Sequence, residues 1–373
     1  MPKPPPYNPM QSAVSKWAAQ ATCIDDGVAA GLLATAPKRF TIYEPMAIFP
    51  SGSFTSPIWA RTISQCSESD LSPLWITIAQ ELSNVAKSPV THLAINEGIP
   101  LLKGGETEEN ILRSPTGLQM IHGDFGPSQT ESEQPTDAEF NVALWVTTKQ
   151  NGIHQTWAPR WTMFSRGNVK EKARLLTFPR PAAQEDAPWA VDMYAGIGYF
   201  VFSYATMGMR ILGWELNPWS VEGLRRGALM NKWTVKVVRG QDLTLPMTEI
   251  MATGEQIVIF QDDNQNAQSK IAELHDMETA HNIRHLNGGL LPTSELIWQA
   301  AAAITSKSPE TWLHLHENVA TDDIEGQAEE MEARFKTWTQ GTVAECRSSH
   351  VEKVKTFAPG VWHCVFDIYI RRT

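Results

Sequence analysis

The segment Val191–Phe200, with the sequence VDMYAGIGYF, decides the fold of this chain. An apolar run, Trp189–Tyr194, leads into the glycines Gly196 and Gly198, and a helical pattern follows over Tyr199–Met207. A strand, a glycine-rich turn and a helix in this order place a nucleotide at the helix N-terminus in doubly wound α/β proteins. The two glycines permit positive φ angles and a close approach of the backbone to a ligand. The segment therefore predicts a nucleotide-binding α/β domain.

The sequence downstream of this turn alternates strand-like and helical segments, which predicts βαβ units and a parallel sheet. The expected strands are Arg210–Glu215, Thr234–Val238, Gln256–Gln261, Arg284–Gly288, Thr311–His316 and Cys364–Ile370, and the expected helices are Asn217–Met230, Ser294–Ile304 and Asp322–Trp338. The segments Val343–Lys355 and Phe357–Ile370 flank the turn Ala358-Pro359-Gly360. That arrangement predicts an antiparallel hairpin at the C-terminal edge of the sheet.

The sequence upstream predicts a smaller, N-terminal α/β domain. Its expected elements are a helix over 11–35, an amphipathic helix Asp70–Lys87 opened by Ser72-Pro73, strands Thr91–Asn96, Leu118–His122 and Phe140–Thr147, and exposed polar loops Gly104–Asn110 and Gly126–Glu139. We expect four parts: a disordered, Pro-rich start at 1–10, this smaller domain at 11–150, a linking segment at 151–180 and the nucleotide-binding domain at 181–373.

Composition limits the classes of function. The 373 residues include 31 Lys and Arg against 41 Asp and Glu, a net charge of −10, so any nucleic-acid binding has to come from a local basic face. Cys23, Cys66, Cys346 and Cys364 form no CxxC pair, which predicts neither a zinc site nor a disulfide framework. We find no secretory h-region and no apolar run long enough to span a membrane. We therefore expect a soluble, cytoplasmic protein without a metal.

Acidic residues near the glycine turn indicate which nucleotide is bound. Glu215 ends the strand after the turn, where a carboxylate can accept hydrogen bonds from ribose hydroxyls, and Asp242 follows the next strand in a place suited to adenine contact. Asp192 suits a cofactor with an ammonium group, such as S-adenosylmethionine. Val201 replaces the third glycine of GxGxxG. The pattern favours a class I S-adenosylmethionine-dependent methyltransferase-like Rossmann fold over a dehydrogenase, although Asp192 could be a turn cap and Glu215 a solvated acid.

An acid-amide turn, Phe260–Asn264 (FQDDN), follows the fourth expected strand. Ligands of doubly wound sheets bind at the carboxyl ends of the strands, so Asp262, Asp263 and Asn264 are predicted to face the site of chemistry. A carboxylate can accept a proton, and an amide can pair with a purine edge. The alternative is that these residues cap the helix that follows.

The segment Trp157–Arg174 (WAPRWTMFSRGNVKEKAR) is locally basic in an acidic chain. The six cations up to Arg180 are Arg160, Arg166, Lys170, Lys172, Arg174 and Arg180, against one acid, Glu171. The aromatic residues Trp157 and Trp161 are interspersed with them. Cations for phosphates and aromatic faces for a splayed base are the means by which single-stranded RNA is recognised. The alternative is a solvated helix face with ion pairs.

Several motifs in order carry a family resemblance that extends from about residue 39 to the end. They are YEPMAIFPSGSF, THLAIN, ILRSPTG, HGDFGP, NGIHQTWAPRWTMFSRGNVKEKAR, VDMYAGIGYF, GWELNPWSVEGLRRG, LNGGLLPTS and LHLHENV. The chain resembles the tRNA wybutosine-synthesising protein 2 family, in particular its fungal members. The resemblance implies transfer of the 3-amino-3-carboxypropyl group of S-adenosylmethionine to C7 of 4-demethylwyosine, next to the anticodon of tRNA(Phe), with release of methylthioadenosine. The alternative is tRNA guanine-N1 methylation at the same position, whose enzymes carry an Asn-Pro-Pro-Tyr type turn that is absent here.

This resemblance and the reaction that it implies assign the site residues. The expected catalytic residues are Asp263 as the base, Asn264 and Arg166. The expected cofactor-binding residues are Ser165, Arg166, Arg174, Asp192, Ala195, Gly196, Gly198, Glu215, Asn217, Asp242 and Asp263, with Arg166 and Arg174 as candidates to hold the cofactor carboxylate. The expected RNA-binding residues are Arg160, Lys170 and Lys172. The resemblance also implies that the domain at 11–150 is RNA-associated, that the basic segment at 151–180 contributes to the cofactor and tRNA site, and that the domain at 181–373 is catalytic. Asp262 stands where the family commonly has glycine, so the backbone flexibility of that turn is in question. We also expect the protein to be a monomer.

Overall fold

The computed structural model describes residues 7–97, 102–103, 108–109, 115, 117–128, 134–179, 188–276 and 282–372. The chain divides into two compact units, one made of Met1–Thr148 and Trp157–Phe164, the other of Lys149–Thr156 and Ser165–Thr373. The expected segment at 151–180 is therefore not a linker of its own, because its described residues are shared between the units. Its cation Arg180 lies outside the described residues, as does most of the predicted loop Gly104–Asn110.

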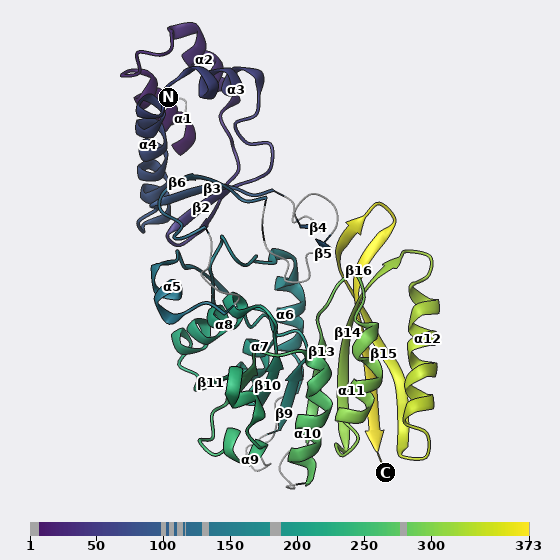
Figure 1. Cartoon of the computed structure of the whole chain (residues 1–373). Helices are drawn as coiled ribbons and strands as arrows, with labels where there is room; N and C mark the ends of the chain where they lie inside the picture. Colours follow the sequence, from purple (N-terminus) through teal and green to yellow (C-terminus); the bar gives the residue numbers. More distant parts are fainter. Residues whose placement is uncertain are drawn as a thin grey trace. The chain divides into compact units, whose positions relative to one another are not determined.

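The second unit contains an eight-stranded sheet in the order β11-β12-β10-β9-β13-β14-β16-β15 (Figure 1). The strands are β9 (Trp189–Asp192), β10 (Arg210–Trp214), β11 (Val235–Val238), β12 (Ile257–Phe260), β13 (Ile283–Gly288), β14 (Glu310–Ala320), β15 (Val343–Ala358) and β16 (Val361–Arg372). The pairs from β11 to β14 are parallel, and β16 runs antiparallel to both β14 and β15. The expectation of a mostly parallel sheet with a C-terminal hairpin is confirmed.

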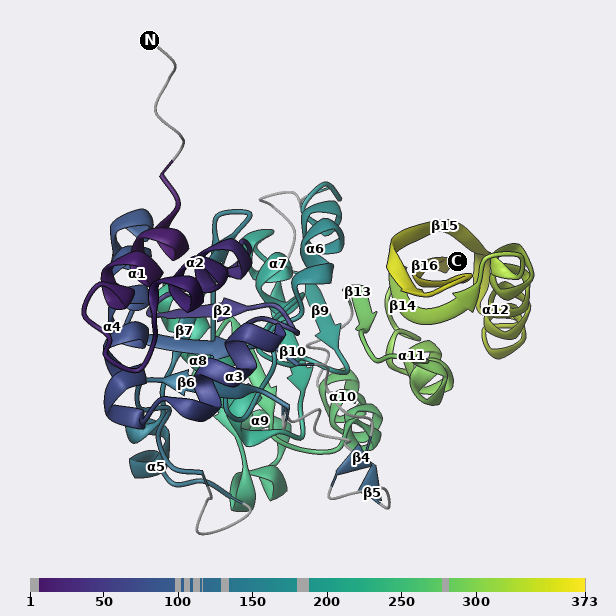
Figure 2. The same ribbon diagram turned by 90° about the horizontal axis from the view of Figure 1, so that it is seen from above.

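Helices cover both faces of this sheet because its strands are apolar on both sides. The helical elements are η1 (Arg166–Asn168), α6 (Val169–Leu175), α7 (Val201–Thr206), α8 (Pro218–Met230), η2 (Gly240–Thr244), α9 (Met247–Ile250), η3 (Asn264–Asn266), α10 (Ala267–Asp276), η4 (Glu295–Ile297), α11 (Trp298–Ile304) and α12 (Ile324–Trp338). One apolar core joins Ile211 and Ile257 to α7 and α8, and the other joins Leu212 and Val258 to α10, α11 and α12. Successive residues of a strand face opposite sides, which explains the two cores. Figure 2 shows α12 beside the strands β14, β15 and β16.

The first unit has a four-stranded sheet in the order β1-β2-β3-β6, together with helices that pack on one another (Figure 1). Its elements are α1 (Pro9–Ala18), α2 (Asp26–Thr35), β1 (Thr41–Tyr43), β2 (Met46–Phe49), α3 (Pro57–Gln65), α4 (Glu68–Ala86), β3 (His92–Ile95), β4 (Leu102–Lys103), β5 (Glu108–Glu109), β6 (Gln119–His122) and α5 (Asp137–Val142). The hairpin β7 (Val146–Gln150) and β8 (Ile153–Trp157) spans the boundary between the units along the chain.

Several predictions for the first unit are wrong in their boundaries. The helix predicted at 11–35 is two helices, because the side chain of Asp25 caps a new helix by accepting a hydrogen bond from Val28 N–H. The first helix begins at Pro9, inside the stretch that we expected to be disordered. The amphipathic helix starts earlier than Ser72, because Ser67 and Asp70 form a capping box.

Two further predictions fail for reasons of tertiary structure. The strand predicted over Phe140–Thr147 begins with helix α5, which Thr136 caps through a hydrogen bond from Glu139 N–H. A disulfide joins Cys23 and Cys66, whose Cα atoms lie 5.7 Å apart, although 43 positions separate them in the sequence. The expectation of no disulfide is therefore wrong, since spacing alone did not reveal that the fold brings these residues together.

Candidate active site

The glycine turn after β9 has the geometry that the sequence predicts. Gly196 and Gly198 have φ angles of +53° and +89°. A Cβ atom on Gly198 would lie 2.6 Å from the ring of Phe202, so the position is closed to larger residues. The Ala195 N–H donates to the carbonyl of Trp214 at 2.9 Å, which ties the turn to the end of β10.

Glu215 lies directly beside this turn. Its Oε2 accepts a hydrogen bond from Gly196 N–H at 2.9 Å, and its Oε1 accepts one from Asn217 N–H at 2.8 Å. Burial raises the pKa of the Glu215 carboxyl, while the backbone hydrogen bonds oppose that rise. The residue is therefore not a solvated strand-end acid, and its oxygens keep further lone pairs for ribose hydroxyls. Asn217 itself caps α8 by accepting a hydrogen bond from Trp219 N–H at 3.0 Å.

Asp192, at the end of β9, has no exposed surface. Its Oδ1 accepts hydrogen bonds from Tyr194 N–H at 3.2 Å and from Asn287 Nδ2 at 3.1 Å. Its Oδ2 is buried and has no hydrogen-bond partner among the residues that the structure describes. Burial raises the pKa of Asp192 to about 7, although these two hydrogen bonds oppose the rise. A buried, unpaired carboxylate oxygen beside a nucleotide turn fits the ammonium group of S-adenosylmethionine.

The order of the strands changes the roles expected for the acids that follow β11 and β12. Strand β12 lies between β11 and β10, so the end of β12, and not that of β11, is next to Glu215. Asp242 is exposed in η2 after the edge strand β11, so the structure gives no support to its prediction as the adenine contact. Asp263 and Asn264 follow β12, one strand beyond Glu215.

The geometry of the acid-amide turn supports this placement. Asn264 Nδ2 donates to the carbonyl of Met193 at 2.8 Å, and Asp263 caps η3 by accepting from Gln265 N–H at 2.9 Å. Asp262 accepts a hydrogen bond from Asn266 Nδ2 at 2.9 Å. In the described chain, non-glycine residues with positive φ are Phe54, Lys87, Asn151 and Lys232, so the turn does not require glycine at Asp262. The alternative of a helix cap, left open by the sequence, is correct for Asp263.

On the other side of β9, the end of β13 holds residues to which we assigned no role. Asn287 contacts Asp192, and the turn Gly289–Ser294 follows. Glu317 of β14 fixes this turn, because its Oε1 accepts from the N–H and the Oγ of Ser294 at 2.7 and 2.9 Å. Burial raises the pKa of Glu317 against these bonds. The motif LNGGLLPTS contained the signal, a polar residue and glycines at the end of a buried strand.

Lys172, predicted to bind RNA, is instead buried on α6. Its Nζ donates to Gln150 Oε1 at 2.6 Å and to Gln155 Oε1 at 2.7 Å, and it lies 5.7 Å from the ring centroid of Tyr199 in the glycine turn. Burial lowers the pKa of Lys172 to about 8. Since a buried ammonium cannot meet an RNA phosphate, that prediction is wrong, and Lys172 belongs with the turn.

Arg174 is engaged within the protein. Its Nε donates to Glu171 at 2.8 Å, and its terminal nitrogens donate to Glu171 and to Asp367 of β16. Burial alone would lower the pKa of Arg174, but the hydrogen bonds and charges of Glu171 and Asp367 outweigh it and raise the pKa. His314 Nδ1 lies 2.7 Å from the same Asp367. Arg174 therefore fastens α6 to the sheet, and its prediction as the cofactor's carboxylate ligand is not supported.

The remaining cations of the basic segment differ in their surroundings. Ser165 N–H donates to the hydroxyl of Tyr199 at 3.0 Å, so the predicted cofactor residue Ser165 lies at the turn. Arg166 is exposed in η1. Lys170 is exposed and pairs with Glu352 of β15 at 2.5 Å. Arg160 belongs to the first unit. Among the described cations of this segment, Arg166 and Lys170 are therefore exposed and Arg160 is half-buried, whereas Lys172 and Arg174 are engaged within the protein.

Comparisons with known proteins agree with this geometry. A family model described as the TRM5/TYW2 methyltransferase domain matches residues 146–277. The tRNA wybutosine-synthesizing protein 2 of Schizosaccharomyces pombe is 38% identical over 335 residues, which cover 89% of this chain and 72% of the relative. The protein of the same name from Saccharomyces cerevisiae is 33% identical, with 90% of this chain and 75% of the relative covered.

Solved structures share the fold. The crystal structure of P. horikoshii TYW2 in complex with MeSAdo has a TM-score of 0.58 at 17% identity and covers 97% of this chain and 99% of its own. The structure of Trm5b from Pyrococcus abyssi has a TM-score of 0.53 at 15% identity, with 94% and 79% covered. Within the described residues, no helix is long and apolar enough to cross a membrane, and no three His, Cys, Asp or Glu side chains cluster as metal ligands.

Proposed function

Because the chain belongs to the tRNA wybutosine-synthesising protein 2 family, we propose that it transfers the 3-amino-3-carboxypropyl group of S-adenosylmethionine to C7 of 4-demethylwyosine in tRNA(Phe). The transfer forms a bond from C7 to the methionine arm, breaks the bond from that arm to sulfur and releases the C7 proton and methylthioadenosine. The cofactor supplies the carbon electrophile through its sulfonium. The expected cytoplasmic location and monomeric state are part of this proposal.

The observation that carries the proposal is the pair of buried, opposite charges around the glycine turn. Asp192 presents a buried carboxylate oxygen without a partner in the described structure, which suits the ammonium of an amino acid. Lys172 is a buried cation beside Tyr199, which suits the carboxylate of the same amino acid. A donor whose amino-acid arm is transferred needs that arm held at both ends, so that its reactive carbon meets the base within about 3–3.5 Å.

The sheet orders the remaining roles along its carboxyl edge. Glu215 at the end of β10 accepts from the ribose, and Asp263 with Asn264 at the end of β12 contacts the adenine. The turn after β13, fixed by Glu317, receives the reacting base, since it lies on the opposite side of β9. We therefore assign Asp263 to cofactor binding and no longer to removal of the C7 proton. Arg160, Arg166 and Lys170 contact tRNA phosphates.

Product analysis tests the reaction. The full-length protein is incubated with S-adenosylmethionine and tRNA(Phe) carrying 4-demethylwyosine, and the small molecules released are separated by chromatography. We expect methylthioadenosine and a tRNA that has gained the aminocarboxypropyl mass. Release of S-adenosylhomocysteine with a methylated tRNA would instead establish the methyltransferase alternative. Asp192→Asn should release methylthioadenosine more slowly than the unaltered protein. A substitution of the exposed Lys307, which lies outside the site, is the control and should leave the rate unchanged.

A further inference from the structure

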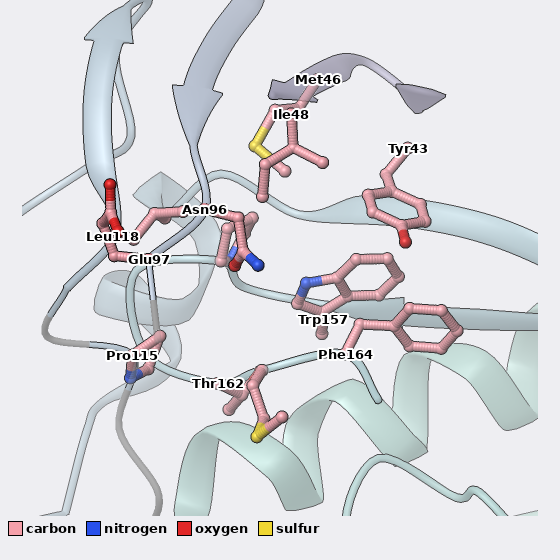
Figure 3. Close-up of a pocket in the computed structure, with 12 residues that line it drawn as sticks. Tyr43, Met46, Ile48, Asn96, Glu97, Pro115, Leu118, Trp157, Thr162 and Phe164 are labelled. Atoms are coloured by element: carbon pink, nitrogen blue, oxygen red, sulfur yellow. The ribbon is translucent and has the colours of Figure 1, made fainter. Parts of the chain in front are cut away.

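The pocket that Figure 3 shows lies in the first unit, and its aromatic side is a feature of packing. Tyr43 meets Trp157 edge-on at 4.9 Å, and Trp157 stacks on Phe164 at 4.5 Å. Because Tyr43 and Trp157 are 5% and 3% exposed, these rings cover one another and offer no open face to a ligand. The buried polar side chains of the second unit are different, because several of them form one continuous network.

This network crosses the sheet of the second unit. His285 Nδ1 on β13 lies 2.9 Å from His314 Nε2 on β14, and His314 Nδ1 lies 2.7 Å from Asp367 Oδ1 on β16. Asp367 also accepts hydrogen bonds from Arg174 of α6. The three side chains on the strands are 3%, 0% and 1% exposed. The Asp367 network, as we call these four residues, therefore joins three strands to α6.

The charge of Asp367 holds the network together. Burial alone would raise the pKa of Asp367, but the charges and hydrogen bonds of His314 and Arg174 outweigh burial and keep the pKa below its ordinary value. An ionised carboxylate can only accept hydrogen bonds, so His314 donates from Nδ1 and Arg174 from its guanidinium. A buried carboxylate that loses a donor is left under-satisfied, which makes each donor important for the position of the other.

The contact between Arg174 and Asp367 is the strong tie between α6 and the sheet. The other carboxylate that pairs with Arg174, Glu171, lies on α6 itself and so does not fix the helix to a strand. Lys170 of α6 pairs with Glu352 of β15, but the Lys170 side chain is 64% exposed, and an exposed ion pair contributes little. In the Arg174 pair the side chains are only 16% and 1% exposed.

The same short helix carries the ammonium of Lys172, two positions before Arg174. Lys172 Nζ lies between Gln150 Oε1 at 2.6 Å and Gln155 Oε1 at 2.7 Å, and 5.7 Å from the ring centroid of Tyr199 in the glycine turn. A helix of two turns is not stable by itself, so its place depends on the contacts that hold it. The position of the ammonium therefore depends on the tie between Arg174 and the sheet.

We propose that His314 and Asp367 are positioning residues, which act through Arg174 to hold α6 where the Lys172 ammonium meets the carboxylate of the amino-acid arm of S-adenosylmethionine. The inference rests on the proposed function, because that proposal assigns Lys172 to this carboxylate. The donor carbon has to lie within about 3–3.5 Å of the base, so the arm needs a fixed place as much as a charged partner. The Asp367 network thus acts on the arm and not on the nucleoside.

Calorimetric titration of the full-length protein with three ligands tests this role. S-adenosylmethionine and S-adenosylhomocysteine carry the amino-acid arm, whereas methylthioadenosine lacks it. His314→Leu removes one donor to Asp367 and should raise the Kd of both arm-bearing ligands by about 3- to 30-fold, within the range for residues coupled in one network. The Kd of methylthioadenosine should stay within about twofold, since a change confined to the arm leaves the nucleoside contacts in place.

Two substitutions and a control separate positioning from stability. His314→Asn places an amide donor near the former Nδ1 and should keep all three Kd values within about threefold. Asp367→Asn removes the charge at constant shape and should repeat the selective loss, also where His314→Leu does not fold. Thr311→Val is the matched control on β14. It removes a buried hydrogen bond, from Thr311 Oγ1 to the carbonyl of Ile283 at 2.7 Å, that does not involve α6, and it should leave all three Kd values unchanged.

A double substitution tests whether the network acts through Lys172. Lys172→Met alone should weaken binding of the arm-bearing ligands and spare methylthioadenosine. Adding His314→Leu should then weaken binding no further, because the arm has already lost its cation. Additive losses, or an unchanged affinity in Lys172→Met, overturn the inference.

The titrations and the product analysis fail separately. Equal loss of affinity for all three ligands in His314→Leu and Asp367→Asn, or no loss for any of them, overturns the positioning role, while release of methylthioadenosine by the unaltered protein leaves the proposed function intact. A selective loss for the arm-bearing ligands, with S-adenosylhomocysteine as the product of the unaltered protein, supports the positioning role and overturns the proposed function.

Discussion

Binding of S-adenosylmethionine should strengthen as the pH rises from 6 to 7, because Asp192 has to ionise. With a pKa of about 7, this acid is ionised in about one molecule in eleven at pH 6 and in about half at pH 7. If only the carboxylate accepts the ammonium of the ligand, the association constant rises about fivefold over this interval. Asp192→Asn removes the ionisation but keeps an oxygen for Tyr194 N–H, so its affinity should be lower and independent of pH. Losing a hydrogen bond to a charged group corresponds to about 1.5–3 kcal/mol.

Calorimetric titration with S-adenosylmethionine at pH 6.0, 6.5 and 7.0 measures this dependence. Glu215→Gln serves as the matched control, since it should weaken binding at every pH and keep the slope. Stability of the free protein gives a second readout. The pKa of Asp192 in the folded state, about 7, exceeds its ordinary value of 3.8, so the folded state binds more protons and stability falls as the pH rises through this window. Asp192→Asn should abolish that fall, which amounts to about 1 kcal/mol between pH 6 and 7 and to about 4 kcal/mol over the whole interval between the two pKa values. A flat affinity in the unaltered protein, or the same slope in Asp192→Asn, would refute the assignment of the ammonium to Asp192.

Three further outcomes follow from the site. Burial lowers the pKa of Lys172 from 10.5 to about 8, so between these values the unfolded chain binds more protons than the folded protein. The free energy of unfolding, measured in urea, should therefore rise by about 1.4 kcal/mol from pH 7 to 9, and Lys172→Met should lack this rise. Asp263→Ala should raise the Kd for S-adenosylmethionine about tenfold and leave kcat at saturating cofactor within about threefold in steady-state assays. An unchanged Kd with a strongly lowered kcat would instead indicate that Asp263 accepts the proton. Asp367→Asn should lower the free energy of unfolding by about 1.5–3 kcal/mol in urea melts, because it removes one of the two carboxylates that pair with Arg174 and leaves Glu171 as the other. An unchanged melt would refute that role.

The sequence predicts those parts of the structure that short-range chemistry determines. The turn with Gly196 and Gly198 needs positive φ angles, and only glycine adopts them freely. Glu215 follows a buried strand, so its place at the sheet edge is a consequence of strand length. The hairpin around Ala358-Pro359-Gly360 is confirmed, because its turn and its two strands are neighbours in the chain.

The order of the strands could not be predicted, because it depends on contacts between distant segments. After β10 the chain builds β11 first and then inserts β12 between β11 and β10. An order in which β11 lies next to β10 would have the same pattern of apolar strands and intervening helices as the observed order. The sequence therefore does not distinguish the two strand orders. The consequence is functional: the proposed adenine contact moves to the end of β12, and the roles proposed for Asp242 and Asp263 change with it.

The basic segment illustrates why a run of charges does not define a surface. Its cations differ in partners that lie far away in the sequence: Asp367 is 193 residues from Arg174, and Gln150 is 22 residues from Lys172. A buried cation needs hydrogen-bond acceptors, so Arg174 and Lys172 are used in contacts within the protein. Composition alone would have assigned both side chains to RNA binding. Lys172 lies at the glycine turn, Arg174 holds α6 to β16, and Arg166 and Lys170 stay exposed. The basic character of this segment is therefore the sum of separate requirements, and only its exposed cations remain available for the RNA contact that the whole run of charges suggested.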